Sequence, residues 1–172
     1  MVASGALTLL FGSKETSDFW VDGLEVWWEQ VEGGCGRVRT PVIYPDNGPN
    51  NAGVRTPFLK RMVGFVDATG LTVRLVYYPP YHSKYNPVER CWSSPERKWG
   101  GALLTSLEVI LSYARRMTWR GEHPTVEVLT GEYADGVKLT KAEMKPVEAR
   151  RERSETLPKY DVTLRPLKGT GG

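Results

Sequence analysis

Short apolar runs alternate along the chain with stretches whose apolar residues recur at helical spacing. The runs at 6–11, 40–46 and 71–77 contain β-branched or aromatic residues and predict strands. Between the first two runs, apolar residues predict one face of a helix that ends at Gly33: Trp20, Leu24, Trp27, Trp28 and Val31. We expect the tryptophans of this face to lie in the core rather than to stack on bases.

Polar residues around these patterns indicate caps and solvated faces. Thr16, Ser17 or Asp18 can cap the first helix, and Asp18 and Asp22 are expected to be solvated. A second amphipathic pattern predicts a helix packed on a sheet through one apolar set: Phe58, Leu59, Met62, Val63, Phe65 and Val66. Three basic residues are expected to point outward from that helix: Arg55, Lys60 and Arg61.

The later part of the chain continues the alternation. Thr105 and Glu108 have capping-box spacing and predict the start of an amphipathic helix that Gly121 closes. Residues 124–129 predict a strand, 141–153 an exposed helix and 160–164 a last strand. This order predicts an α/β fold in which helices flank a mixed sheet. A chain of 172 residues has the length of one domain.

Composition changes this picture little. The net charge of +3 permits nucleic-acid binding without requiring it. Basic and acidic residues interleave over 138–168, which is typical of a solvated helix face. Cys35 and Cys91 are isolated, so no disulfide framework or zinc knuckle is indicated. No apolar run approaches membrane-spanning length and no signal peptide is evident, so we expect a cytoplasmic protein without membrane contact.

Two carboxylates occupy positions where α/β proteins often place functional groups. Asp46 ends a predicted strand and begins a turn-rich loop. Glu89 follows the strand at 71–77 and lies in the first turn of a helix that Asn86 and Pro87 begin. Each has a simpler alternative. Asp46 can belong only to a turn, and Glu89 can merely complement the helix dipole.

Longer motifs favour the functional interpretation, because they resemble the ISAzo-type (Rhodopirellula-type) DDE transposases of bacterial insertion sequences. The resemblance spans roughly residues 11–166, and it suggests the C-terminal portion of such an enzyme. Six segments carry it: Phe11–Ser13, Thr16–Asp22, Asp46–Pro49, Tyr77–Trp92, Met117–Trp119 and Leu157–Val162.

The resemblance implies an RNase H-like fold and metal-dependent cleavage and transfer of DNA strands at transposon ends. Residues 1–130 would form part of the catalytic domain, and residues 131–172 its C-terminal extension. Asp46 matches the second catalytic carboxylate and Glu89 the third, and both would bind Mg²⁺ or Mn²⁺. Three residues beside Glu89 would contact DNA, although a structural hydrogen bond is the alternative for the histidine: His82, Lys84 and Tyr85.

The first carboxylate of the family has no match, since none of the ten residues before Phe11 is Asp or Glu. We therefore expect the opening strands of the sheet to be absent and the chain to be inactive alone, which leaves enzyme status open. Full-length transposase, or a part encoded upstream, would be its partner. The alternative is a catalytically dead DNA-binding or transposase-interacting regulatory fragment. Pro95 departs from the family pattern and predicts a kink or early end in the Glu89 helix.

Overall fold

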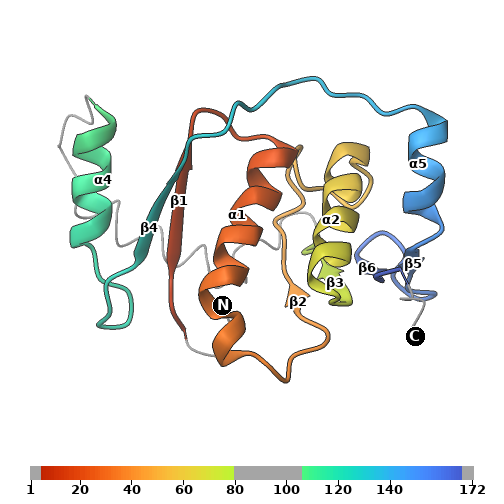
Figure 1. Ribbon diagram of the computed structural model, residues 1–172, viewed down its shortest axis with the longest axis horizontal. Coiled ribbons are helices and arrows are strands. Elements are labelled where there is room, and N and C mark those ends of the chain that lie inside the picture. The colour runs from red at the N-terminus through yellow and green to blue at the C-terminus, as the bar shows by residue number, and fades with distance from the viewer. Residues whose placement is uncertain (1–4, 80–105, 168–172) are drawn as a thin grey trace. The chain divides into compact units, whose positions relative to one another are not determined.

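A computed structural model describes residues 5–79 and 106–167 (Figure 1). The chain divides into two compact units, which are described separately. The larger unit comprises residues 13–80 and 131–172, and the smaller comprises residues 1–12 and 81–130. Within the described ranges, no helix has both the length and the apolar character needed to cross a membrane.

A mixed four-stranded sheet forms one layer of the larger unit. Its strands lie in the order β2 (Val42–Ile43), β3 (Val73–Val76), β6 (Asp161–Leu164) and β5 (Arg151–Arg153). β2 and β3 are parallel, whereas β6 runs antiparallel to both β3 and β5. β2 is shorter than the predicted strand, because Pro41 and Pro45 flank it and proline has no N–H for the ladder.

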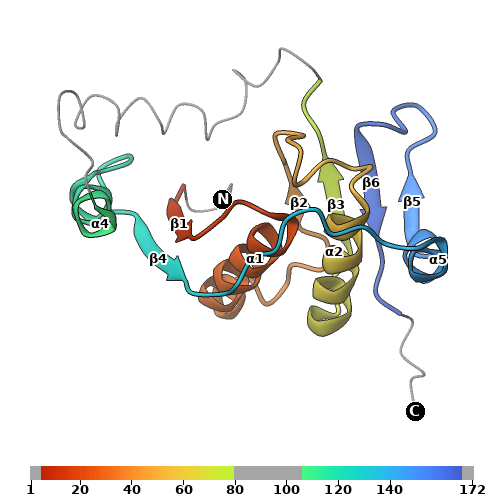
Figure 2. The same cartoon turned by 90° about the horizontal axis from the view of Figure 1, so that it is seen from above.

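Three helices of the larger unit lie on the same side of this sheet (Figure 2). They are α1 (Ser17–Val31), α2 (Thr56–Thr69) and α5 (Lys141–Glu148), and the short 3-10 helix η1 (Glu32–Gly34) follows α1. Thr16 caps α1, because its Oγ1 accepts a hydrogen bond from the Phe19 N–H at 3.2 Å. Gly70 ends α2 in the left-handed conformation at φ 68°, which glycine adopts without a steric penalty.

The core of the larger unit lies between α2 and the sheet. All six apolar residues predicted for α2 are buried. Alternate residues of β3 and β6 face them: Val73, Leu75, Val162 and Leu164. On α1 the tryptophan prediction is confirmed in part. Trp20, Leu24 and Trp28 are only partly buried against the core, whereas Val21, outside the predicted face, is fully buried.

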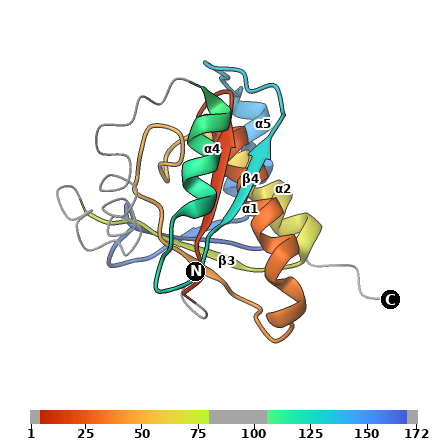
Figure 3. The same cartoon turned by 90° about the vertical axis from the view of Figure 1, so that its left-hand side faces the viewer.

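The described part of the smaller unit, residues 5–12 and 106–130, contains one helix and two parallel strands. β1 (Thr8–Gly12) pairs with β4 (Thr125–Leu129), and α4 (Leu107–Arg116) stands beside them (Figure 3). Its described part buries three apolar side chains, those of Ala114, Met117 and Pro124. These elements confirm the strands predicted at 6–11 and 124–129 and the amphipathic helix between them.

Three predicted helix boundaries were wrong. The N-cap of α4 is Ser106, whose Oγ accepts a hydrogen bond from the Val109 N–H, so the helix begins one residue later than predicted. Backbone at Met117 is already extended, and α4 therefore ends before Gly121. The helix predicted over 141–153 ends at Glu148, because residues 151–153 pair with β6 as β5. Strand pairing there overrides the local helical pattern.

Candidate functional site

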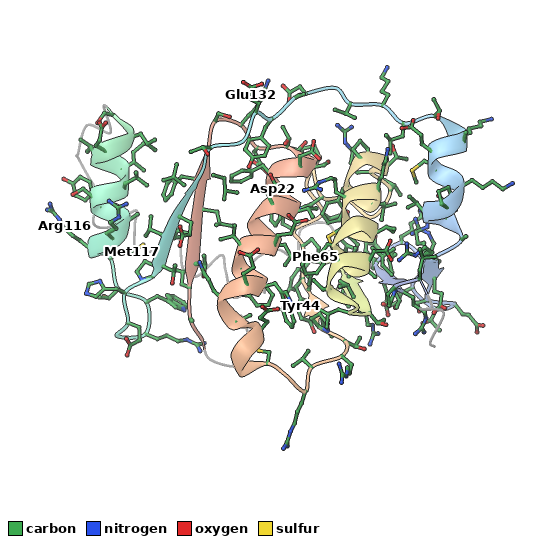
Figure 4. The ribbon with its side chains drawn as sticks, viewed as in Figure 1. Asp22, Tyr44, Phe65, Arg116, Met117 and Glu132 are labelled. Carbon is green, nitrogen blue, oxygen red and sulfur yellow. The ribbon has the colours of Figure 1, made fainter. Side chains whose placement is uncertain are left out.

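The carboxyl ends of β2 and β3 lie at the same edge of the sheet, because the two strands are parallel. Asp46 follows β2 at this edge, and its side chain is exposed. The aromatic rings of Tyr44 and Tyr78, which follow β2 and β3, lie 5.9 Å apart between centroids. Tyr44 is labelled in Figure 4. The segment that leads to Glu89 continues from the end of β3.

Two donors hold one oxygen of the Asp46 carboxylate. The Asn51 side-chain amide donates to Asp46 Oδ1 at 2.7 Å, and the Gly48 N–H donates to the same oxygen at 3.3 Å. Among the described residues, no donor reaches Oδ2. Asn47 adopts φ 65°, the left-handed conformation that asparagine tolerates better than most residues. The loop is thus the predicted turn, and that turn presents a carboxylate oxygen to solvent.

Asn51 connects this loop to the end of β3. It is 1% exposed, and its carbonyl accepts a hydrogen bond from the Tyr77 hydroxyl at 3.1 Å. Burial raises the pKa of Tyr77, so the phenol stays protonated and can donate. On the other side of the loop, Ser17 Oγ donates to the Asn50 carbonyl at 2.7 Å, and Asn50 Nδ2 donates to the Glu15 carbonyl at 2.8 Å.

Arg153 of β5 supports the same loop from the sheet. Its guanidinium donates to the carbonyls of Gly53, at 3.0 Å, and Pro158, at 2.6 Å. Burial lowers the pKa of Arg153, and the neighbouring charge of Arg151 contributes. Gly53 lies so close to the Tyr77 ring that a Cβ there would be 2.9 Å from Cε2. Strand and loop are therefore packed without room for another side chain.

A second polar cluster joins α1 to α2. Arg61 forms ion pairs with three carboxylates of α1: Asp18 at 3.1 Å, Asp22, and Glu25 at 3.7 Å. The Tyr133 hydroxyl donates to Asp22, which is labelled in Figure 4. Burial and the Asp22 carboxylate raise the pKa of Tyr133 to about 12. Asp18 and Asp22 are therefore engaged by Arg61, which faces α1 rather than pointing outward as predicted.

Several basic residues near the C-terminus form ion pairs within the larger unit. Arg150 pairs with Asp67, Arg151 with Glu148, and Arg165 with Glu152. Four lysines of the same region are exposed: Lys138, Lys141, Lys145 and Lys159. This arrangement agrees with the solvated face predicted from the interleaved charges.

The oxygen atoms at and beside Asp46 are ligand atoms of the kind that a hard divalent cation prefers. They are those of the Asp46 carboxylate and, next to it, Asn51 Oδ1, which is buried and has no partner among the described residues. A Cβ on Gly48 would lie 3.4 Å from both Asp46 oxygens and 3.6 Å from Asn51 Oδ1, so the three oxygens converge on this glycine. Mg²⁺ prefers oxygen ligands. Residues 5–79 and 106–167 contain no group of three metal-binding side chains, so Asp46 is a lone carboxylate there.

Asp46 is the one predicted site residue that the structure describes. Glu89, His82, Lys84 and Tyr85 lie outside the described residues, as does the Pro95 helix. Sequence reasoning missed Asn51 and Tyr77. Asn51 belongs to the turn-rich loop after Asp46. Tyr77 ends the predicted strand at 71–77 and begins the Tyr77–Trp92 motif. Burial of both was not evident from the pattern of the chain.

The motifs that indicate a transposase agree with a family-level comparison. The family model described as Rhodopirellula transposase DDE domain matches residues 2–166. Searches of the curated proteins and of the solved structures gave no match. With nearly the whole chain matched, and with a mixed α/β architecture, the chain belongs to the Rhodopirellula transposase DDE domain family.

Proposed function

We propose that this protein is related to transposases that cut and join DNA strands with divalent metal ions, on an RNase H-like fold. One observation carries the proposal beyond family membership. β2 and β3 are parallel neighbours, so Asp46 and the segment leading to Glu89 leave the sheet at one edge. A carboxylate on that segment would be suited to share a cation with Asp46.

In this proposal Asp46 and Glu89 hold Mg²⁺ or Mn²⁺. When bound, the ion supplies electrostatic stabilisation of the charge that develops on the phosphoryl group. Asp46 would use Oδ2, because Asn51 and Gly48 already occupy Oδ1. His82, Lys84 and Tyr85 would bind the phosphates or the scissile strand of a transposon end. Their positive or hydrogen-bonding groups are of the kind that DNA backbones attract.

The proposed site supplies two of the three carboxylates that the chemistry requires. We expect the protein alone to be inactive or slower by orders of magnitude, since a missing ligand removes part of the charge stabilisation. Full-length transposase, or a part encoded upstream, would supply the third. We also propose a second candidate function. In it, the protein binds DNA or transposase without catalysing a reaction.

A plasmid-nicking assay with added Mg²⁺, and with EDTA as the metal-free control, tests the first function. We expect any metal-dependent nicking to disappear in Asp46→Ala and in Glu89→Ala. Glu155→Ala, which changes an exposed carboxylate in the larger unit, should retain it. Nicking that survives Glu89→Ala would exclude that residue from the site. Salt-sensitive DNA binding without nicking, unchanged in Asp46→Ala, would favour the second function.

A further inference from the structure

We propose that Asn51 is the positioning residue of Asp46. Its side-chain amide fixes Oδ1 of the carboxylate and leaves Oδ2 to a divalent cation. This inference rests on the proposed function, because it concerns the same site. It adds a residue that the motif match does not identify.

The hydrogen bond between the two side chains defines how Asn51 is oriented. Asn51 Nδ2 lies 2.7 Å from Asp46 Oδ1, which is the distance of a strong bond to a charged acceptor. The opposite amide orientation would place Asn51 Oδ1 against the carboxylate, where two acceptors repel each other. The carboxylate therefore requires the orientation that is present.

This orientation leaves the other end of the amide without a partner. Asn51 Oδ1 is buried and accepts no hydrogen bond from the described residues. An unsatisfied buried acceptor is unfavourable, and an apolar side chain of similar volume would avoid that cost. The amide donor to Asp46 is the interaction that an asparagine provides here and an apolar residue does not.

The backbone of Asn51 is held in turn. Its N–H donates to the Gly48 carbonyl at 3.4 Å, and its carbonyl accepts from the Tyr77 hydroxyl at 3.1 Å. Tyr77 is buried at the end of β3. The chain of contacts from Tyr77 through Asn51 to Asp46 fixes the carboxylate relative to the strand that leads to Glu89. Groups that orient a metal ligand in this way commonly change metal affinity by about 10-fold to 100-fold when removed.

Binding of Mn²⁺ to the full chain, followed by the electron paramagnetic resonance signal of the free ion, tests the inference. We expect Asp46→Ala to abolish the site and Asn51→Ala to weaken it by about 10-fold or more. Asn50→Ala is the matched control. It removes a 2.8 Å hydrogen bond of the same loop, to the Glu15 carbonyl, but no hydrogen bond joins Asn50 to Asp46 among the described residues. We expect its affinity to stay within about twofold of the unmodified protein, below the range for lost ligand orientation.

Thermal unfolding of each variant separates positioning from folding, with binding measured at a temperature where all variants are folded. Should Asn51→Ala fail to fold, Asn51→Leu keeps the number and branching of the side-chain heavy atoms and still removes the donor. Unchanged affinity in the Asn51 variant, with binding lost in Asp46→Ala, would overturn the inference and leave the proposed site intact. An equal loss of Mn²⁺ affinity in Asn50→Ala would also overturn the inference, because disruption of the loop would then explain the weaker binding in both variants. Unchanged binding in Asp46→Ala would overturn both the metal site and the role of Asn51.

Discussion

The side chain of Arg150 links the segment between α5 and β5 to α2 and to the chain that follows β6. It is mostly buried, and its two terminal nitrogens both donate to the Asp67 carboxylate of α2. Nε and one terminal nitrogen also donate to the Arg165 carbonyl beyond β6, each at 2.9 Å. The Arg150 hydrogen bonds hold the pKa of Asp67 below its usual value. A planar guanidinium makes these contacts at once, which an ammonium does not.

We therefore expect Arg150→Lys to destabilise the protein although it keeps the charge. The lost hydrogen bonds should lower the free energy of unfolding by about 1–3 kcal/mol. Urea denaturation monitored by tryptophan fluorescence measures the change. Arg165→Lys is the control, because the Arg165–Glu152 pair lies on the surface. Equal midpoints for Arg150→Lys and the unmodified protein would show that the network does not contribute.

Two glycines of the larger unit should respond in opposite directions to the same substitution. In Gly53→Ala, the new methyl would meet the Tyr77 ring at 2.9 Å, and we expect a loss of about 1–3 kcal/mol. In Gly64→Ala, the new Cβ would have no neighbour within 4 Å outside the backbone of its own helix. The free energy of unfolding should rise by about 0.5–1 kcal/mol, because alanine is the better helix former. Thermal and urea unfolding measure both variants. Similar stabilities would contradict the tight packing of Gly53 on Tyr77.

At the scale of single residues, sequence reasoning placed Asp46 in the loop after a strand, although β2 ends at Ile43, earlier than predicted. The apolar strand pattern and the following Asn-Gly turn are local signals, and the structure contains both a strand and a turn there. The partners of Asp46 were not predictable in the same way. Asn51 and Tyr77 become neighbours only when the β2–α2 loop packs on the end of β3, and no local pattern encodes that contact.

At the scale of elements, prediction depended on whether one face of the element is buried. The helical part of α2 that carries its six predicted apolar residues is confirmed, because all six are buried in the core. The helix predicted over residues 151–153 was wrong, since a partly buried strand of charged residues has no apolar alternation to reveal it. Pairing with β6 decides their conformation.

The start of α5 depends on a carboxylate with a strongly shifted pKa. Glu143 accepts hydrogen bonds from the Thr140 N–H and hydroxyl, and Thr140 accepts from the Glu143 N–H, which completes a capping box. The Thr140 N–H, and Lys60 of α2, lower the pKa of Glu143 to about 2. Only the charged form makes these contacts at full strength.

We expect the stabilising effect of Glu143 to depend on pH. A lowered pKa means that its contribution is complete above the ordinary value near 4.5 and is lost as the pH falls toward about 2. Glu143→Gln should therefore melt at a lower temperature than the unmodified protein at pH 7, and the difference should vanish near pH 2. Glu155→Gln, at an exposed turn, is the control and should show no such trend. A difference independent of pH would exclude charge as its cause.

For the whole molecule, burial is unevenly divided between the two units. The continuous apolar core belongs to the larger unit and joins α1, α2, α5, β3 and β6. In the smaller unit, the described residues bury only Ala114, Met117 and Pro124, and Leu107 of α4 is 50% exposed. Interior packing provides most of the stability of helices, so the two units should differ in resistance to local opening.

Hydrogen exchange measured by mass spectrometry on the full chain tests this difference. We expect the amides of α2, β3 and β6 to exchange slowest, because their side chains form the core. Those of α4 should exchange much faster, although α4 is a capped helix of ten residues with helical hydrogen bonds of the same kind. Met117→Ala should accelerate exchange in α4 while leaving α2 unchanged, whereas Leu59→Ala should accelerate α2. Equal protection of α2 and α4 would mean that the units open together, and the uneven burial would then not control local stability.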